Sequence, residues 1–177
     1  MASKQTLDVG HIAARLLAVT LSMGLTLDEI IVQGEGVHLE HDPFEISLGS
    51  PGTLDIRISE SSLAEFLNHK APGGLSDFKV KLADGLIHIE AKASMIISIS
   101  VGAVCKLRIE DGTKLFVDLV RMEAIGGTGA YNLVQRQLDN INPVLDTAEL
   151  PVRAELATIE IENQWLVLHG TIAPRPE

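Results

Sequence analysis

The feature that most constrains the fold is an alternation of apolar and polar side chains with a period of two. In FKVKLADGLIHIEAKA, residues 78–93, every second side chain is apolar on either side of an acidic turn, and the alternation returns around Leu107 and Ile109. Successive side chains of a strand point to opposite faces of a sheet, and Asp-Gly between two such runs is typical of a hairpin. The stretch therefore predicts an antiparallel sheet with one dry face and one wet face.

Two further stretches carry the same pattern, an acidic or amide turn followed by alternating apolar residues. They are IEDGTKLFVDL and IENQWLVLHG. Because the three do not recur at a fixed period, a solenoid is not expected. Other strands are expected at residues 30–39, 44–48, 53–58, 152–161 and 165–172, with a bulge or bend at Gly34 and Gly36.

Three helices are expected to cover this sheet. Residues 1–24 fit an amphipathic helix with an apolar face of Val9, Ile12, Ala13, Leu16 and Val19. A second helix begins at Ser59 or Ser62, either of which can cap it, and ends at Pro72-Gly73-Gly74. A third runs from the glycine turn at 126–129 to about Ile141. The expected fold class is α+β, a strongly curved antiparallel sheet wrapped around or covered by about three helices.

The composition of the chain limits the kinds of partner that the protein is expected to bind. The chain has 177 residues, enough for one domain with a substantial core, and 46% of them are apolar but only 3% aromatic. The interior is therefore built from aliphatic side chains. A formal net charge of −10 makes nucleic acid an unexpected partner, because phosphate neutralisation needs clustered Lys and Arg. It also disfavours tight docking on anionic lipid surfaces.

The sequence carries no clear targeting signal. No apolar run approaches the ~20 residues of a membrane-spanning helix. The N-terminal stretch lacks a basic segment leading into an apolar one, because Asp8 and His11 interrupt it, and no A-x-A site follows. The expected location is cytoplasmic, or periplasmic and envelope-associated if the N-terminus was trimmed.

The single cysteine, Cys105, is expected to be a small core residue.

Motifs for catalysis are missing from the sequence. It contains no G-x-S-x-G, H-E-x-x-H or GKS/GKT pattern, so we expect neither an enzyme nor a cofactor. His38, His41 and Asp42 are the densest group of metal-ligand residue types, but residues three apart on a strand point to opposite faces, so no metal site is expected. The turn at 126–129 is typical of a helix cap, although backbone N–H groups of Gly127, Thr128 and Gly129 can also hold a lipid head group.

What remains is a surplus of aliphatic surface. A curved sheet whose strands carry apolar residues beyond one clean face can enclose a cavity for acyl chains, or the same residues can pack against one another. If the cavity exists, its lining is expected from the apolar helix faces and the most apolar strands. These residues are Leu63, Phe66, Leu67, Ile97, Ile99, Leu119, Val134 and Leu138.

The order of motifs resembles that of a known family. RISESSLAEFL, FKVKLADGLIHIEAKA and RIEDGTKLFVDLV follow one another, and after a glycine turn come YNLVQRQLDNINPVLD and LPVRAELATIEIENQWLVLHGTI. Together these stretches, residues 58–172, are similar to the bacterial LmeA-like phospholipid-binding family. The resemblance implies a fold related to tubular lipid-binding (TULIP-like) domains, a hydrophobic groove for phospholipid tails, and lipid handling at the cell envelope without catalysis.

The leading hypothesis is thus a non-catalytic module of one domain, residues 1–177, that binds phospholipid or another fatty-acyl ligand and contacts membranes transiently. The alternative is a closed structural or protein-interaction domain without ligand, whose edge strands pair with a partner or with a second copy in a homo-oligomer. An enzyme ranks third, since no spacing predicts converging carboxylates or histidines.

Overall fold

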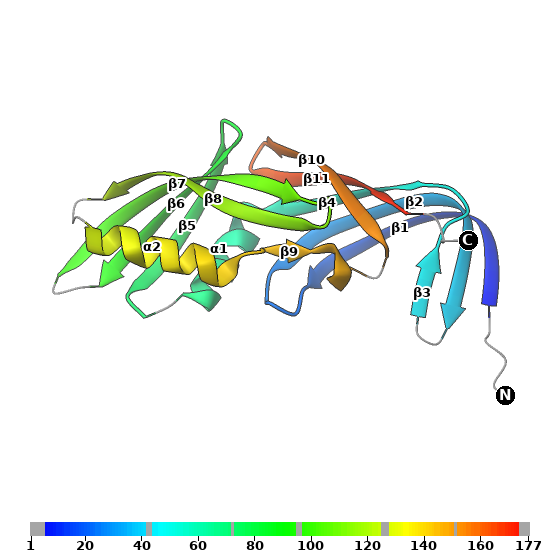
Figure 1. Cartoon of the computed structure of the whole chain (residues 1–177), viewed down its shortest axis with the longest axis horizontal. Helices are drawn as coiled ribbons and strands as arrows, with labels where there is room; N and C mark the ends of the chain where they lie inside the picture. Colours follow the sequence, from blue (N-terminus) through cyan, green and yellow to red (C-terminus); the bar gives the residue numbers. More distant parts are fainter. Residues whose placement is uncertain are drawn as a thin grey trace.

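The architecture is that of two antiparallel sheets with helices packed beside one of them (Figure 1). The computed structural model of the chain describes residues 6–41, 44–71, 73–94, 97–124, 128–150 and 152–173. Within this part of the chain the strands form a six-stranded and a five-stranded sheet. Figure 1 shows the five-stranded sheet at one end and the curved hairpin of β1 and β2, with β3, at the other.

The six-stranded sheet joins the two ends of the sequence. Its path runs through β1 (Thr6–Thr20), β2 (Thr26–His41), β4 (Gly52–Ser59), β11 (Trp165–Ile172) and β10 (Ala154–Glu162), while β3 (Phe44–Ser47) pairs with β2 off this path. Every pairing is antiparallel. The expected strands near residues 30, 53, 152 and 165 are therefore confirmed.

The five-stranded sheet is a meander in chain order. It consists of β5 (Leu75–Ala83), β6 (Leu86–Ser94), β7 (Ser98–Glu110), β8 (Lys114–Ala124) and β9 (Leu145–Asp146). Its hairpin turns use the residues that the sequence indicates: Asp84 and Gly85 have φ of 55° and 72°, and Asp111 and Gly112 have φ of 51° and 66°. Two consecutive positive φ values define the type I′ turn, which matches the right-handed twist of the strands it joins.

Two α-helices and one short 3₁₀ helix occur among the described residues, one α-helix fewer than expected. They are α1 (Glu60–Lys70), α2 (Thr128–Ile141) and η1 (Thr147–Glu149). Figure 1 shows α1 and α2 lying beside the curled, half-barrel arrangement of β5 to β8. The α+β class and the curved antiparallel sheet are confirmed.

The missing helix is the N-terminal one, and its prediction is wrong for the described residues. Residues 6–20 form β1, which pairs with β2 from Thr6 opposite Glu40 to Thr20 opposite Thr26. The spacing of Ile12 and Leu16 fits a helix, but β-branched residues favour strands, and a long partner strand satisfies the backbone equally well. Tertiary pairing therefore overrides the helical pattern.

Gly34 and Gly36 mark the bend of β2 that the sequence indicates. Gly36 has φ of 63°, in the left-handed region, and a Cβ at Gly34 would lie 2.6 Å from Leu48 Cδ1. A side chain at position 36 would therefore be strained, and one at position 34 would require Leu48 to move. The register of β1 against β2 stays constant past this point, so the feature is a bend and not an inserted residue.

One continuous aliphatic core links the two sheets and the helices. Its most buried large side chains come from both sheets and include Leu54, Ile56, Ile58, Leu115, Leu145, Leu166, Leu168 and Ile172. Cys105 is also fully buried, as expected. In the described part of the chain, no helix is long and apolar enough to cross a membrane.

Candidate functional site

Two cavities lie where the helices meet the five-stranded sheet. The first, called here the α2 cavity, has a volume of about 20 Å³. Its walls come from α1, α2 and strands β5 to β7. The lining residues are Leu67, Leu75, Phe78, Ile89, Ala91, Val101, Ala103, Cys105, Val134, Gln137 and Leu138.

The second cavity, called here the α1 cavity, lies between α1 and residues of both sheets. It has a volume of about 30 Å³. Its lining residues are Leu25, Ile58, Leu63, Phe66, Leu67, Val80, Ile87, Ile89, Leu107, Leu115, Val117, Ile141, Val144 and Leu166. Every one of them is aliphatic or aromatic.

The two cavities share walls. Leu67 of α1 and Ile89 of β6 line both of them. The cavities therefore adjoin and form an apolar seam between the helices and the sheet. Each has room for only one or two water molecules, so in this conformation the seam is closed.

Five of the eight predicted lining residues lie in these walls. Leu63 and Phe66 line the α1 cavity, Val134 and Leu138 line the α2 cavity, and Leu67 lines both. All five lie on the apolar faces of the two helices that sequence spacing identified.

The three predicted strand residues lie outside both walls. Ile99 and Leu119 are half-buried and pack against the core. Ile97 is 70% exposed, directly before β7 begins at Ser98, so its prediction as a lining residue is not supported.

The predicted head-group site falls at the start of α2. Thr128 is the first residue of α2 and Gly129 follows it, whereas Gly127 lies outside the described residues. The head-group role of this turn stays a prediction.

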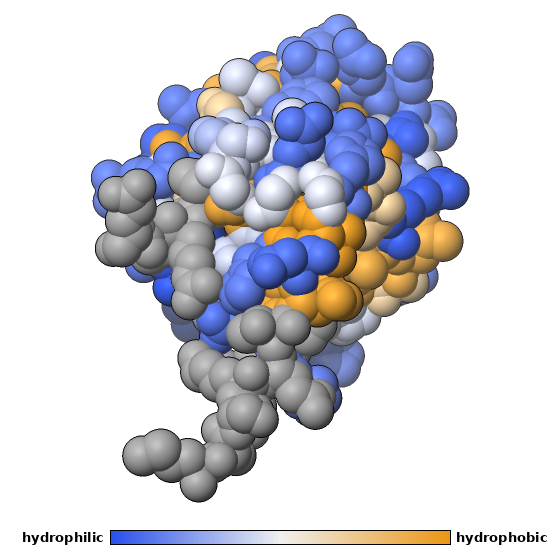
Figure 2. Space-filling view, turned by 90° about the vertical axis from the view of Figure 1, so that its right-hand side faces the viewer, coloured by the Kyte–Doolittle hydropathy of each residue, from blue (hydrophilic) through white to orange (hydrophobic). Residues whose placement is uncertain are grey.

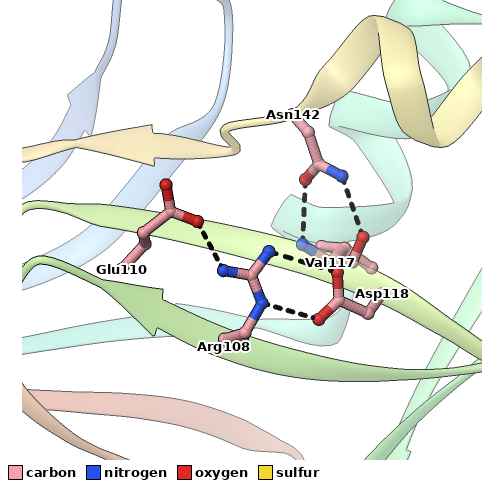
Figure 3. A network of polar contacts seen from close by, with 5 residues as sticks. All are labelled: Arg108, Glu110, Val117, Asp118 and Asn142. Carbon is pink, nitrogen blue, oxygen red and sulfur yellow. Dashed lines mark hydrogen bonds and ion pairs between the residues drawn. The ribbon is translucent and has the colours of Figure 1, made fainter.

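Two asparagines fasten the helices to the sheet beside the cavities. In α1, Asn68 Oδ1 accepts a hydrogen bond from Phe78 N at 2.9 Å, and its Nδ2 donates to Phe78 O at 3.1 Å. After α2, Asn142 Oδ1 accepts from Val117 N and its Nδ2 donates to Val117 O, both at 2.8 Å (Figure 3). Each carboxamide thus pairs with the backbone N–H and C=O groups of one strand residue, as a neighbouring strand would. Phe78 lines the α2 cavity, and Val117 lines the α1 cavity.

The start of α1 is fixed to the six-stranded sheet. Ser59 is the N-cap, as one of the two predicted options, and its Oγ accepts a hydrogen bond from Ser62 N at 3.1 Å. Asp28 of β2 accepts from Ser59 N at 2.7 Å and from Ser62 Oγ at 3.0 Å. The helix therefore bridges the two sheets.

Gln137 is the site residue that the prediction missed. It lies on α2, is only 3% exposed and is the one carboxamide in the wall of the α2 cavity. The sequence does hold a signal, because position 137 is three residues after Val134 and four before Ile141, on the apolar stripe of the helix.

Among the residues that the structure describes, no charged side chain lines either cavity. Arg108 donates to Asp118 and to Glu110 (Figure 3). Its guanidinium group also lies over the ring of Phe116. His38 contacts Asp8, with 2.5 Å between Nδ1 and Oδ1. The described residues contain no group of three or more His, Cys, Asp or Glu that could hold a metal ion.

Burial also sets the chemistry of Cys105 in the α2 cavity. Removal from water, with a smaller contribution from the Asp118 charge, raises the pKa of the thiol to about 12. Cys105 is therefore a neutral wall residue and not a nucleophile at neutral pH.

No family model, no curated protein and no solved structure matches this chain. The similarity to the LmeA-like family therefore stays a prediction from the order of its motifs.

Proposed function

We propose that the protein binds one long-chain hydrophobic ligand, such as the acyl part of a phospholipid, in the seam between its helices and the five-stranded sheet. The observation that carries the proposal is the pair of adjoining apolar cavities that share Leu67 and Ile89. Transfer of an acyl chain from water into such walls contributes about 0.8 kcal/mol for each CH₂ group. A role in lipid transfer or in envelope lipid homeostasis belongs to the same proposal.

Uptake requires the seam to widen, because the two cavities together are far smaller than an acyl chain. The helices are the elements that can move, since the sheet strands are held by long antiparallel ladders. α2 is fastened to β8 after its C-terminal end by Asn142, and Gln137 Nε2 donates to Lys70 O of α1 at 3.3 Å. An outward rotation of α2 about its Asn142 end would join the cavities into one groove.

The test is native mass spectrometry of freshly purified protein, with organic extraction of anything bound and then titration with a dioleoyl phosphatidylcholine or phosphatidylglycerol dispersion. We expect near-stoichiometric lipid on the unaltered protein. V134W, which fills the α2 cavity from a half-buried wall position, should abolish binding.

The matched control is I97W, which places the same indole on an exposed residue outside both cavities. It should bind lipid like the unaltered protein. Equal binding by folded V134W and I97W would reject the seam as the site, and failure of the unaltered protein to bind any long-chain lipid, neutral or charged, would reject the function.

A second candidate function is self-association, and the observation that favours it is β1. This strand pairs only with β2 among the described strands, and its Leu7 and Leu17 side chains are 59% and 61% exposed. A long apolar edge strand is a template for pairing with another chain. Antiparallel pairing of two copies about Ile12 would place Leu7 of each opposite Leu17 of the other.

Light scattering after size-exclusion chromatography tests this second candidate. We expect a dimer that L17K converts to a monomer, because a lysine opposite a leucine at a sheet junction disfavours pairing. V120K, at another exposed apolar residue on β8, is the control and should stay dimeric. A monomeric unaltered protein at high concentration would reject the candidate.

A further inference from the structure

The wall of the α2 cavity holds one polar atom whose hydrogen-bonding capacity is unused. Gln137 is 3% exposed, and its Oε1 has no hydrogen-bond partner among the described residues. Buried side-chain oxygens are nearly always satisfied, and an unsatisfied one is costly. The atom therefore needs an explanation.

The orientation of this carboxamide is fixed by its other end. Gln137 Nε2 donates to the backbone carbonyl of Lys70, in the last turn of α1, at 3.3 Å. A carbonyl oxygen only accepts, so the amide nitrogen must face Lys70 and the amide oxygen must face away from it. The unpaired acceptor is thus a property of how the helices pack and not of an arbitrary amide rotation.

A trapped water explains Oε1 poorly. A buried water typically makes about three hydrogen bonds, and the remaining walls of the cavity are aliphatic or aromatic side chains and the Cys105 thiol. A thiol is a weak donor and acceptor. A water here would keep one good partner and lose the rest, whereas a donor group carried on an apolar body would satisfy Oε1 and bury its own carbon atoms.

We infer that the α2 cavity selects a neutral lipid that carries a hydroxyl group, such as a fatty alcohol or an acylglycerol, and that this hydroxyl donates to Gln137 Oε1. The inference rests on the proposed function and names the ligand class for the same seam. A free carboxylate or phosphate group is disfavoured there, because two acceptors would face each other in an apolar cavity that no cationic side chain lines.

The experiment compares three ten-carbon probes on the full chain by isothermal titration: 1-decanol, decyl methyl ether and decanoate. The ether keeps the oxygen but lacks the donor. We expect 1-decanol to bind about five- to tenfold tighter than the ether, the range expected of one net hydrogen bond, and decanoate to bind weakest.

The variant Q137M keeps the length of the side chain and removes the acceptor. It should weaken 1-decanol about five- to tenfold and leave the ether unchanged. Q135M is the matched control, because Gln135 is half-exposed on the same helix and donates to Asp139. It should leave the alcohol-to-ether ratio as it was.

Equal affinity of the unaltered protein for alcohol and ether would overturn the inference while the proposed function stands. An unchanged ratio in folded Q137M would overturn it too. Failure of all three probes to bind would instead defeat the proposed function, and the inference with it. Because the first affinity ratio is measured on the unaltered chain, that test does not depend on how well Q137M folds.

Discussion

The two sheets differ in whether their apolar side chains are covered by other elements. The five-stranded sheet packs its apolar face under α1 and α2, and each helix is fastened to a strand by an asparagine. The six-stranded sheet ends at β1, where no described side chain of residues 7–20 is buried. Covered apolar surface suits a small hydrophobic ligand, whereas an uncovered edge suits another strand. The comparison assigns ligand binding to the first region and self-association to the second.

Figure 2 views the end of the molecule that carries β1, β2 and β3 in Figure 1. It shows hydrophobic surface near the middle of this end and polar surface above it. An exposed apolar patch is typical of an interaction surface. This end therefore differs from the two cavities, whose apolar lining residues are covered by α1 and α2.

The largest expected effect comes from making the same leucine-to-alanine truncation in both regions. L115A removes a fully buried side chain of β8 and should cost about 2–5 kcal/mol of the free energy of unfolding. At a concentration low enough to keep the protein monomeric, L17A, at an exposed position on β1, should change it by no more than about 0.5 kcal/mol. Urea denaturation measures both. A large loss in monomeric L17A would show that β1 is covered in solution by part of its own chain.

The asparagine contacts give the next largest effect. N142A leaves the backbone N–H and C=O of Val117, a buried residue, without their partners and should cost about 1–3 kcal/mol. The exposed neighbour Asn140 supplies the control, N140A. Denaturation gives the energies, and hydrogen exchange at Val117 should accelerate only in N142A. Unchanged exchange there would mean that Asn142 does not hold α2 to the sheet.

A smaller loss of stability is expected at the start of α1, which joins the two regions. S59A removes the oxygen that accepts from Ser62 N at the start of α1 and should cost about 1 kcal/mol. S76A, on an exposed strand position, should be nearly neutral. Thermal denaturation of the two variants measures the difference. A neutral S59A would show that the hydrogen bond to Ser62 N adds nothing to the contacts of Asp28 with Ser59 N and with Ser62 Oγ.

The smallest expected effect is a dependence on pH in the six-stranded sheet. A hydrogen bond from His169 to Asp55, helped by Glu160, raises the pKa of His169 above its ordinary value. A raised folded-state pKa adds stability that is fully present below about pH 6.5 and is lost as the pH rises through the folded pKa. The melting temperature of the unaltered protein should therefore exceed that of H169Q more at pH 5.5 than at pH 8.5.

Exposed His69 provides the control H69Q for the same pH series. A gap between the unaltered protein and H169Q that stays constant from pH 5.5 to 8.5 would show that the contact with Asp55 does not depend on protonation.

Local chemistry made much of the five-stranded sheet predictable. Asp84-Gly85 and Asp111-Gly112 lie at hairpin turns because few other residues adopt two positive φ values cheaply. In the six-stranded sheet, Asn163 and Gln164 form a turn of the same kind between β10 and β11, with φ of 47° and 72°. Turns of this kind fix the register of the strands beside them, so alternation alone was enough to place the apolar face.

The remaining features depend on partners that are distant in sequence. The spacing of Ile12 and Leu16 fits both a helix and a strand, and only the pairing with β2 decides between them. Gln137 lies on the apolar stripe of α2, but only its contact with Lys70, 67 positions earlier, fixes the direction of its carboxamide. Long-range contacts of this kind are not visible in a local pattern, which explains why the N-terminal strand was missed and why the orientation of the Gln137 amide could not be predicted.

The central claim is that the seam holds the ligand. Photo-crosslinking tests it most directly, with a fatty alcohol that carries a diazirine in its chain and is added at a saturating concentration. If the seam holds the ligand, peptide mapping should find the label on α1, residues 60–70, and on α2, residues 128–141, and unlabelled 1-decanol should compete it away. Label confined to β1, or label that 1-decanol does not displace, would contradict ligand binding in the seam.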